Sequence, residues 1–290
     1  MELDTSDQQW DLEIKPHDTV FNLHLKDVWN YRDLLWLLVR RDFVSFYKQT
    51  VLGPLWFFIQ PIFTTLVFTF VFGNLAKIPT GNVPAPLFYM SGTIAWNYFS
   101  DCLTKTSTVF RDNAGIFGKV YFPRLIMPLS IVFSNLVKFA VQFVLFLCYF
   151  TYYIIKYHYS GGDPVNPNWY ALLFPFIMVL MAIQGLGLGL MVTAMTTKYR
   201  DLTFVVTFGM QLMMYATPII YPLSEAYKKH HEFVAFNPMS GLIETLRYGF
   251  TGGGQFYPAV FFYSVAVSLV LFFLGLVVFN RVEKDFVDTV

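Results

Sequence analysis

The sequence is poor in charged residues. Only 13% of its 290 residues are Asp, Glu, Lys or Arg, which is about half the share found in an ordinary soluble domain. Hydrophobic residues make up 56%, and the mean hydropathy of +0.50 agrees with that excess. This composition excludes a large soluble domain, and the net charge of +1 gives no reason to expect a nucleic acid partner.

The sequence also lacks the motifs of common catalytic and metal sites. Its two cysteines, Cys102 and Cys148, both lie in apolar segments, so neither a disulfide framework nor a metal site is predicted. Neither the P-loop pattern Gly-x-x-x-x-Gly-Lys-Ser/Thr nor His-Glu-x-x-His occurs. Adjacent histidines on a helix point about 100° apart, which makes His230-His231-Glu232 a poor metal site. We therefore expect no catalytic residue, no metal and no cofactor on this chain.

Long apolar runs are what the sequence has in abundance. No charged residue lies between Lys48 and Lys77, and at about 1.5 Å per residue such a run can cross the hydrocarbon core of a membrane. The sequence therefore predicts an all-α integral membrane protein with six transmembrane helices. Their expected positions are about 51–73, 87–109, 126–155, 171–195, 203–221 and 258–279.

Basic residues predict how these spans are oriented. With six spans, both ends of the chain lie on one side of the membrane. That side would hold thirteen Lys and Arg residues, and the opposite side five. Because cytoplasmic loops are enriched in Lys and Arg, both termini are expected in the cytoplasm.

Residues 29–48 are expected to form an amphipathic helix, because Trp29, Trp36, Phe43 and Tyr47 recur near one face. The mixture of Trp, Leu and Arg favours a helix lying in the membrane interface. A short solvated helix packed on a partner is the alternative. The predicted domains are a cytoplasmic tail at 1–28, this interface helix, a transmembrane domain at 49–281 and a second cytoplasmic tail at 282–290.

The connection at 222–257, between the fifth and sixth spans, has apolar stretches that are too short to cross a membrane. Pro disfavours helix at the residue before it, so Asn237-Pro238 is expected to divide this connection into half-helices at about 224–235 and 238–250. These re-entrant half-helices would dip into the outer leaflet, where such backbone is tolerated against protein or a water-filled cavity. A helix pair on the outer surface is the alternative.

Several polar side chains fall inside the predicted spans. A charge in lipid is costly and normally faces the bundle interior or a water path. Asp101 and Lys138 lie in adjacent antiparallel spans, each about 13 Å from the cytoplasmic interface, so we predict that they meet. Gln142 follows one turn later on the face of Lys138. The alternative is that Lys138 extends alone to the interface.

Glycine and proline shape three further spans. Gly185 and Gly189 form a Gly-x-x-x-Gly pattern, which allows another helix to approach closely, either within the chain or in a dimer. Gln60-Pro61 is expected to bend the first span, and Thr217-Pro218 to end the fifth.

Several short motifs occur in a fixed order between residues 25 and 285. They are Arg41-Asp42, Tyr47-Lys48-Gln49, Leu52-Gly53-Pro54-Leu55-Trp56, Gln60-Pro61, Lys119-Val120-Tyr121-Phe122-Pro123-Arg124, Lys198-Tyr199-Arg200-Asp201, Pro218-Ile219-Ile220-Tyr221 and Asn237-Pro238. This ordered set resembles the ABC-2 type polysaccharide export permeases. Those proteins are the membrane subunits that move lipid-linked O antigen, capsular polysaccharide or teichoic acid.

The resemblance implies a homodimer that pairs with two copies of a separate ATP-binding subunit, on which ATP and Mg²⁺ would bind. The cytoplasmic loop of 110–125 would contain the coupling helix that docks on this ATPase. The residues assigned to coupling are Arg111, Lys119, Tyr121, Pro123 and Arg124 in the loop, with Arg41 and Asp42 of the interface helix. The first and fifth spans would line the channel at the dimer interface.

Aromatic residues make up 20% of the chain, more than aromatic belts at the membrane interfaces require. Sugar rings present CH faces that pack on aromatic faces, so a ring-lined channel suits a repeating glycan. For each ring, packing against lipid is the alternative. The candidate channel residues are Trp56, Gln60, Phe63, Phe70, Phe208, Tyr215 and Tyr221.

The sequence thus predicts the permease subunit of an ATP-driven exporter that moves lipid-linked polysaccharide, O antigen in particular, across the inner membrane. The alternatives are a membrane enzyme of envelope glycan or lipid synthesis, and an ABC-2 exporter of drugs or lipids. An enzyme would need catalytic carboxylates or histidines near the interface. The outer side offers Glu225, His230, His231, Glu232 and Glu244.

Overall fold

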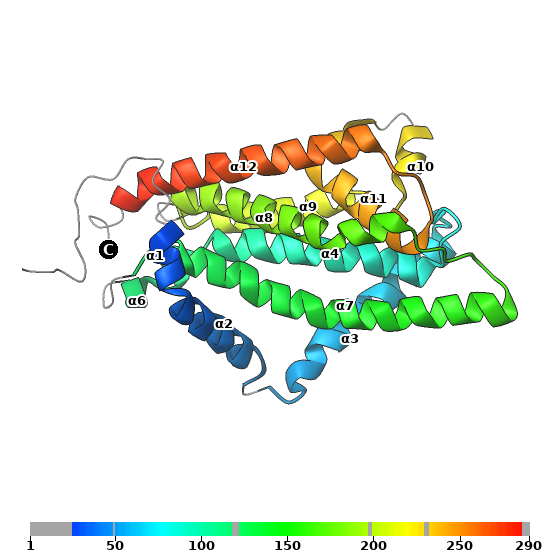
Figure 1. Ribbon diagram of the computed structural model, residues 1–290, viewed down its shortest axis with the longest axis horizontal. Helices are drawn as coiled ribbons and strands as arrows, with labels where there is room; N and C mark the ends of the chain where they lie inside the picture. Colours follow the sequence, from blue (N-terminus) through cyan, green and yellow to red (C-terminus); the bar gives the residue numbers. More distant parts are fainter. Residues whose placement is uncertain (1–24, 49, 118–121, 197–198, 229–231, 286–290) are drawn as a thin grey trace, which may run out of the picture.

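The computed structural model of the protein describes residues 25–48, 50–117, 122–196, 199–228 and 232–285. Helices make up the regular structure of these ranges, and no strand occurs in them. Figure 1 shows the long helices lying alongside one another along the longest axis of the molecule. The predicted all-helical fold is confirmed for the described part of the chain.

The two ends of the molecule hold different elements (Figure 1). The end that we call proximal holds α1 (Leu25–Asn30), α6 (Ala114–Phe117) and the last turns of α12 (Pro258–Asp285). The opposite, distal end holds α10 (Leu223–Lys228) and the start of α12. The first and last described helices thus reach the same end, as an even number of crossings requires.

The helix predicted at 29–48 is present, but its bounds and continuity differ. It consists of α1 and α2 (Arg32–Tyr47), separated at Tyr31, whose φ of −95° and ψ of 20° depart from the α-helix. Asn30 directly precedes this break, and Asn favours turns over helix interiors. α2 then packs against α7 (Ile126–Ser160).

Four segments are long and apolar enough to cross a membrane. The first joins a 3₁₀ turn, α3 (Trp56–Phe68) and a π-helical segment, and the third joins a 3₁₀ turn to α8 (Phe174–Thr196). The second and fourth lie within α7 and α12. The bounds of the four segments are Gly53–Leu75, Ile126–Tyr159, Trp169–Thr196 and Pro258–Arg281. They correspond to the first, third, fourth and sixth predicted spans.

The helices at the second and fifth predicted spans are less apolar or shorter. α4 (Ala85–Thr106) has 22 residues, but polar side chains such as Asp101 and Lys105 lower its hydropathy. α9 (Leu202–Tyr215) is apolar and has 14 residues, which is about 21 Å of helix. The helix at the fifth predicted span, 203–221, is shorter than predicted because it stops ahead of Thr217-Pro218.

The connection predicted at 222–257, which we call the distal segment, divides at Asn237-Pro238, as predicted. The Asn237 side chain accepts a hydrogen bond from the Met239 backbone N–H and so caps α11 (Pro238–Thr251). The single half-helix predicted at 224–235 is wrong, because α10 ends at Lys228 and a 3₁₀ turn covers Glu232–Phe236. Residues 229–231, including His230 and His231, lie outside the described ranges.

Backbone contacts between helices form the centre of the bundle. A Cβ atom at Gly187 on α8 would lie 2.6 Å from the Leu271 carbonyl oxygen of α12, and a Cβ at Gly275 would meet the Gly187 carbonyl. Gly185 and Gly189 approach α4 in the same way. Of the two alternatives for the Gly-x-x-x-Gly pattern, the described structure has packing within the chain.

Candidate functional site

The contact predicted between Asp101 and Lys138 is confirmed. The Lys138 ammonium on α7 donates to Asp101 Oδ2 on α4 across 2.7 Å. Lys105, one turn further along α4, donates to Asn135 Oδ1 across 2.8 Å and lies 4.0 Å from the same Asp101 oxygen. Gln142 is buried on α7, with 2% of its surface exposed. Lys138 therefore does not extend alone, and paired polar side chains join α4 to α7.

Two small cavities, of about 130 and 180 Å³, adjoin this cluster between α2, α4 and α7. Both are lined by Asp42 and Lys105. One Asp42 oxygen accepts from the Arg41 guanidinium across 2.8 Å, and the other accepts from the Ser134 hydroxyl of α7 across 3.3 Å. Asp42 thus fastens α2 to the helix bundle, and its role in docking an ATPase stays a prediction.

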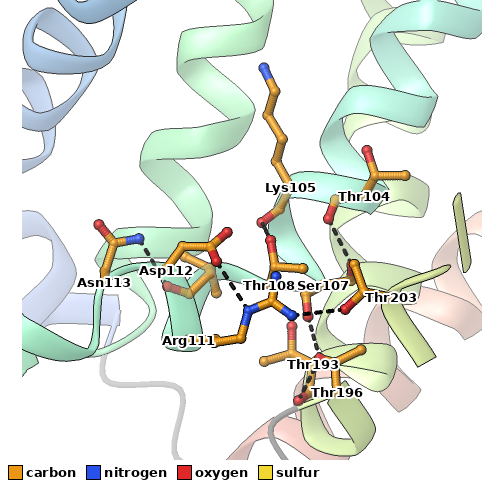
Figure 2. A network of polar contacts seen from close by, with 11 residues as sticks. Thr104, Lys105, Ser107, Thr108, Arg111, Asp112, Asn113, Thr193, Thr196 and Thr203 are labelled. Carbon is orange, nitrogen blue, oxygen red and sulfur yellow. Dashed lines mark hydrogen bonds and ion pairs between the residues drawn. The ribbon is translucent and has the colours of Figure 1, made fainter. Parts of the chain in front are cut away.

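The predicted coupling loop contains two short helices, α5 (Val109–Asp112) and α6. Arg111 on α5 donates through Nη1 to the Thr203 hydroxyl in the first turn of α9, across 3.1 Å. Its Nε donates to the Asp112 carboxylate across 3.2 Å. Figure 2 shows Arg111 lying between these two partners. Arg111 therefore connects the loop to α9.

The other residues predicted for coupling lie around this loop. Pro123 and Arg124 are half-buried just before α7. Arg41 and Asp42 line the larger cavity together with Asp112, which brings the interface helix next to the loop. Lys119 and Tyr121 lie outside the described residues, and the contact of this whole group with an ATPase stays a prediction.

Two threonines of α8 donate hydrogen bonds to the last carbonyls at the proximal end of α4, and the sequence did not predict these contacts. The last carbonyls of a helix lack partners within that helix. Thr193 donates to the Thr106 carbonyl across 2.6 Å, and Thr196 donates to the Ser107 carbonyl. Both threonines are drawn in Figure 2. The sequence feature that could have indicated these contacts is a pair of hydroxyl side chains about one turn apart at the end of an apolar helix.

All predicted channel residues except Tyr221, which follows α9, lie on α3, its π-helical extension or α9. Tyr221 is half-buried and donates to the Tyr215 carbonyl across 3.1 Å. Both α3 and α9 pack against α4. The exposed candidates are Trp56, Gln60, Phe63, Phe70, Phe208 and Tyr215. These side chains face away from the bundle, where a second copy, cargo or lipid can reach them.

A buried ion pair between Glu244 and Arg247 of α11 lies at the distal side, and the sequence did not predict it. The two residues are 2% and 1% exposed, and Arg247 Nη1 donates to Glu244 Oε2 across 2.9 Å. Arg247 Nη2 donates to the Pro218 carbonyl across 2.9 Å, and the guanidinium lies 3.7 Å from the Phe88 ring centroid of α4. The sequence feature that could have indicated this ion pair is two opposite charges at i, i+3 spacing within an apolar segment.

Apolar helices of membrane-spanning length, with ion pairs enclosed between them, define an integral membrane protein of several helices. The sequence model of the ABC-2 type transporter family matches residues 33–251. The chain belongs to this family of ABC transporter membrane proteins.

Relatives of known description match over nearly their whole length. The chain is 26% identical to the O-antigen export system permease protein RfbA of Myxococcus xanthus, over 92% of this chain and 98% of that protein. It is 27% identical to an RfbA of the same description from Klebsiella pneumoniae, over 88% of this chain and 94% of that protein. It is 20% identical to the polysialic acid transport protein KpsM of Escherichia coli, over 85% of this chain and 92% of that protein.

Proposed function

We propose that the chain is the permease subunit of an ATP-driven exporter of lipid-linked polysaccharide, with O antigen as its cargo. The observation that carries this proposal is the similarity to an O-antigen export permease over 92% of the chain and 98% of the relative. Such coverage includes the spans, the coupling loop and the distal segment together. The more distant similarity to a polysialic acid transport protein supports a polysaccharide as the class of cargo.

The chain would lie in the inner membrane with its proximal end in the cytoplasm and with six spans. α4 would be a fifth span besides the four long apolar segments. Its 22 residues form about 33 Å of helix, which is enough to cross a hydrocarbon core of about 30 Å. α9 would complete its crossing with the turns after Tyr215. The 3₁₀ turn Glu232–Phe236 and α11 would form the re-entrant pair at the outer side.

The permease would work as a homodimer with two ATP-binding subunits and would itself hydrolyse no ATP. The lack of a P-loop motif in the sequence supports a separate ATPase. The exposed rings of α3 and α9 support a dimer interface at which these two helices line the channel. Aromatic faces pack on the CH faces of sugars without requiring one pattern of hydroxyl groups.

Deletion of the gene, followed by glycan analysis of the cell surface and the cytoplasm, tests this function. The expected result is loss of surface polymer with lipid-linked polymer accumulating inside, restored by the wild-type gene. Loss of polymer from both places would instead favour a biosynthetic enzyme. Unchanged surface polymer would contradict the proposed cargo.

A further inference from the structure

We propose that α9 is a connecting rod, meaning a helix that shifts as one body and carries movement of the coupling loop to the distal segment. Arg111 and Asn237 are the positioning residues at its two ends. This inference deepens the proposed function and rests on it, because the ATPase supplies the movement of the loop.

The proximal end of α9 is attached to the coupling loop by a side chain. Arg111 lies on α5, and its Nη1 donates to the Thr203 hydroxyl on the first turn of α9 across 3.1 Å. The same guanidinium is held by Asp112 across 3.2 Å, so it is oriented within the loop before it reaches α9. A displacement of α5 therefore acts directly on the start of α9 (Figure 2).

The distal end of α9 is attached to the start of α11. Asn237 Nδ2 donates to the Thr217 hydroxyl across 2.7 Å and to the Ala216 carbonyl across 3.3 Å, just after α9 ends. Asn237 Oδ1 meanwhile accepts from the Met239 N–H and caps α11. One side chain, 8% exposed, thus joins the end of α9 to the first turn of α11.

Between these two attachments, α9 is weakly held by the rest of the chain. Met210 is the buried residue among its 14, whereas twelve of the 23 residues of α8 are buried. α8 is also held to α4 by Thr193 and Thr196 and by glycine contacts, while a Cβ at Gly209 of α9 would meet nothing within 4 Å. A continuous helix is stiff along its axis because each turn is hydrogen-bonded to the next. α9 therefore has fewer packed contacts to lose than α8 if it shifts relative to α4.

The matched substitutions Thr203→Val and Thr207→Val test the proximal attachment in the intact transporter with its ATPase. Valine keeps the shape of threonine and removes the hydroxyl. Thr207 is the control because its hydroxyl donates within α9, to the Thr203 carbonyl across 2.9 Å. Thr203→Ser, which keeps the hydroxyl, is the rescue variant. Two quantities are measured for each: the ATPase rate and the polymer exported per ATP hydrolysed.

Thr203→Val is expected to lower the polymer exported per ATP by about fivefold, the effect of one lost hydrogen bond, with an unchanged ATPase rate. Thr203→Ser and Thr207→Val should match the wild type. Asn237→Ser, which keeps a good cap of α11 but is too short to reach α9, should lower the same ratio. A merely structural role would reduce the amount of protein and leave the ratio unchanged.

Equal ratios for Thr203→Val and Thr207→Val, or an unaffected Asn237→Ser, would overturn the inference and leave the proposed function intact. A fall in the ATPase rate of Thr203→Val in step with export would also overturn it, because Arg111 would then act in docking. Failure of the proposed function is seen separately, as unchanged surface polymer in the deletion strain.

Discussion

The guanidinium of Arg247 lies 3.7 Å from the centroid of the Phe88 ring, which joins α11 to α4. An arginine over an aromatic face is attracted by the negative face of the ring, more strongly when water is excluded. Arg247 is 1% exposed. Gly92, one turn beyond Phe88, leaves room for it, because a Cβ there would lie 3.1 Å from Arg247 Nη2. α4 thus provides a recess, formed by a ring and a glycine, for one charged side chain of α11.

Removing Arg247 alone should destabilise the protein strongly. Arg247→Met leaves the Glu244 carboxylate buried without its partner, and breaking a buried ion pair in this way costs about 3–5 kcal/mol. Glu244→Met combined with Arg247→Met should recover much of that loss, because apolar side chains of similar length replace both charges. Thermal unfolding of the purified protein in detergent, followed by tryptophan fluorescence, measures the change.

Lys228→Met is the control for this prediction. Lys228 pairs with Glu225 across 2.6 Å at the same i, i+3 spacing, but its side chain is 71% exposed. Exposed ion pairs contribute little to stability, so the thermal unfolding midpoint of Lys228→Met should stay close to that of the wild type. A double variant as unstable as Arg247→Met, or an Arg247→Met as stable as Lys228→Met, would contradict the importance of the buried pair.

Gly187→Ala should separate α8 from α12. The added Cβ would lie 2.6 Å from the Leu271 carbonyl oxygen and 2.7 Å from Phe272 Cα, which are backbone atoms that cannot turn aside. Overpacking of this kind costs about 1–3 kcal/mol. The unfolding midpoint in detergent should fall accordingly.

Gly209→Ala makes the same chemical change on α9 and should have the opposite effect. Among the described residues, no atom beyond the adjoining turns of α9 lies within 4 Å of the added Cβ. Ala is about 1 kcal/mol better than Gly inside a helix. Its midpoint should therefore equal or exceed that of the wild type. If both substitutions lowered the midpoint equally, close packing of α8 on α12 would not explain the need for glycine.

The positions of the long helices could be predicted from the sequence because apolar runs report directly on membrane-spanning length. The contact between Asp101 and Lys138 could be predicted as well, since a charge inside a span needs a partner at its own depth and few candidates exist. The position of a residue along its own helix and the order of the helices are sufficient for both predictions.

The contacts of Arg247, Arg111 and Thr196 could not be predicted in this way. Their partners are a ring on α4, a hydroxyl on α9 and the carbonyl of Ser107. Each contact depends on how two helices are rotated about their axes. For α8, which carries Thr196, apolar composition leaves that rotation open, because a helix that is hydrophobic on every side carries no periodic signal.

Exchanging the charges of the Asp101–Lys138 ion pair tests whether this pair stabilises the packing of α4 against α7. Asp101→Lys and Lys138→Asp each place like charges together where the native atoms are 2.7 Å apart, and loss of a charged hydrogen bond costs about 1–3 kcal/mol. The double exchange should restore most of the protein that accumulates in membranes. Recovery will be incomplete, because a lysine at position 101 would face Lys105, which lies 4.0 Å from the native Asp101 oxygen. An equal loss of membrane protein in all three variants would show that the ion pair does not stabilise the packing of α4 against α7.

Removing exposed rings from α3 and α9 should reduce export without slowing the ATPase. Trp56 and Tyr215 are 44% and 55% exposed and lie on helices that both pack against α4. An aromatic contact is worth about 0.5–1.5 kcal/mol, so Trp56→Ala and Tyr215→Ala are each expected to lower export by about two- to tenfold. Surface polymer and the ATPase rate are measured in parallel.

Phe273→Ala on α12 is the control for these two variants. Phe273 is 59% exposed, so its removal takes away a comparable outward ring from a helix that the channel prediction does not involve. Its export should equal that of the wild type, because one lipid-facing ring replaced by alanine changes neither the channel nor the buried core. Full export by Trp56→Ala and Tyr215→Ala would instead assign their rings to lipid. An equal fall in all three would mean that loss of any outward ring disturbs the protein, which would leave the channel without a specific aromatic lining.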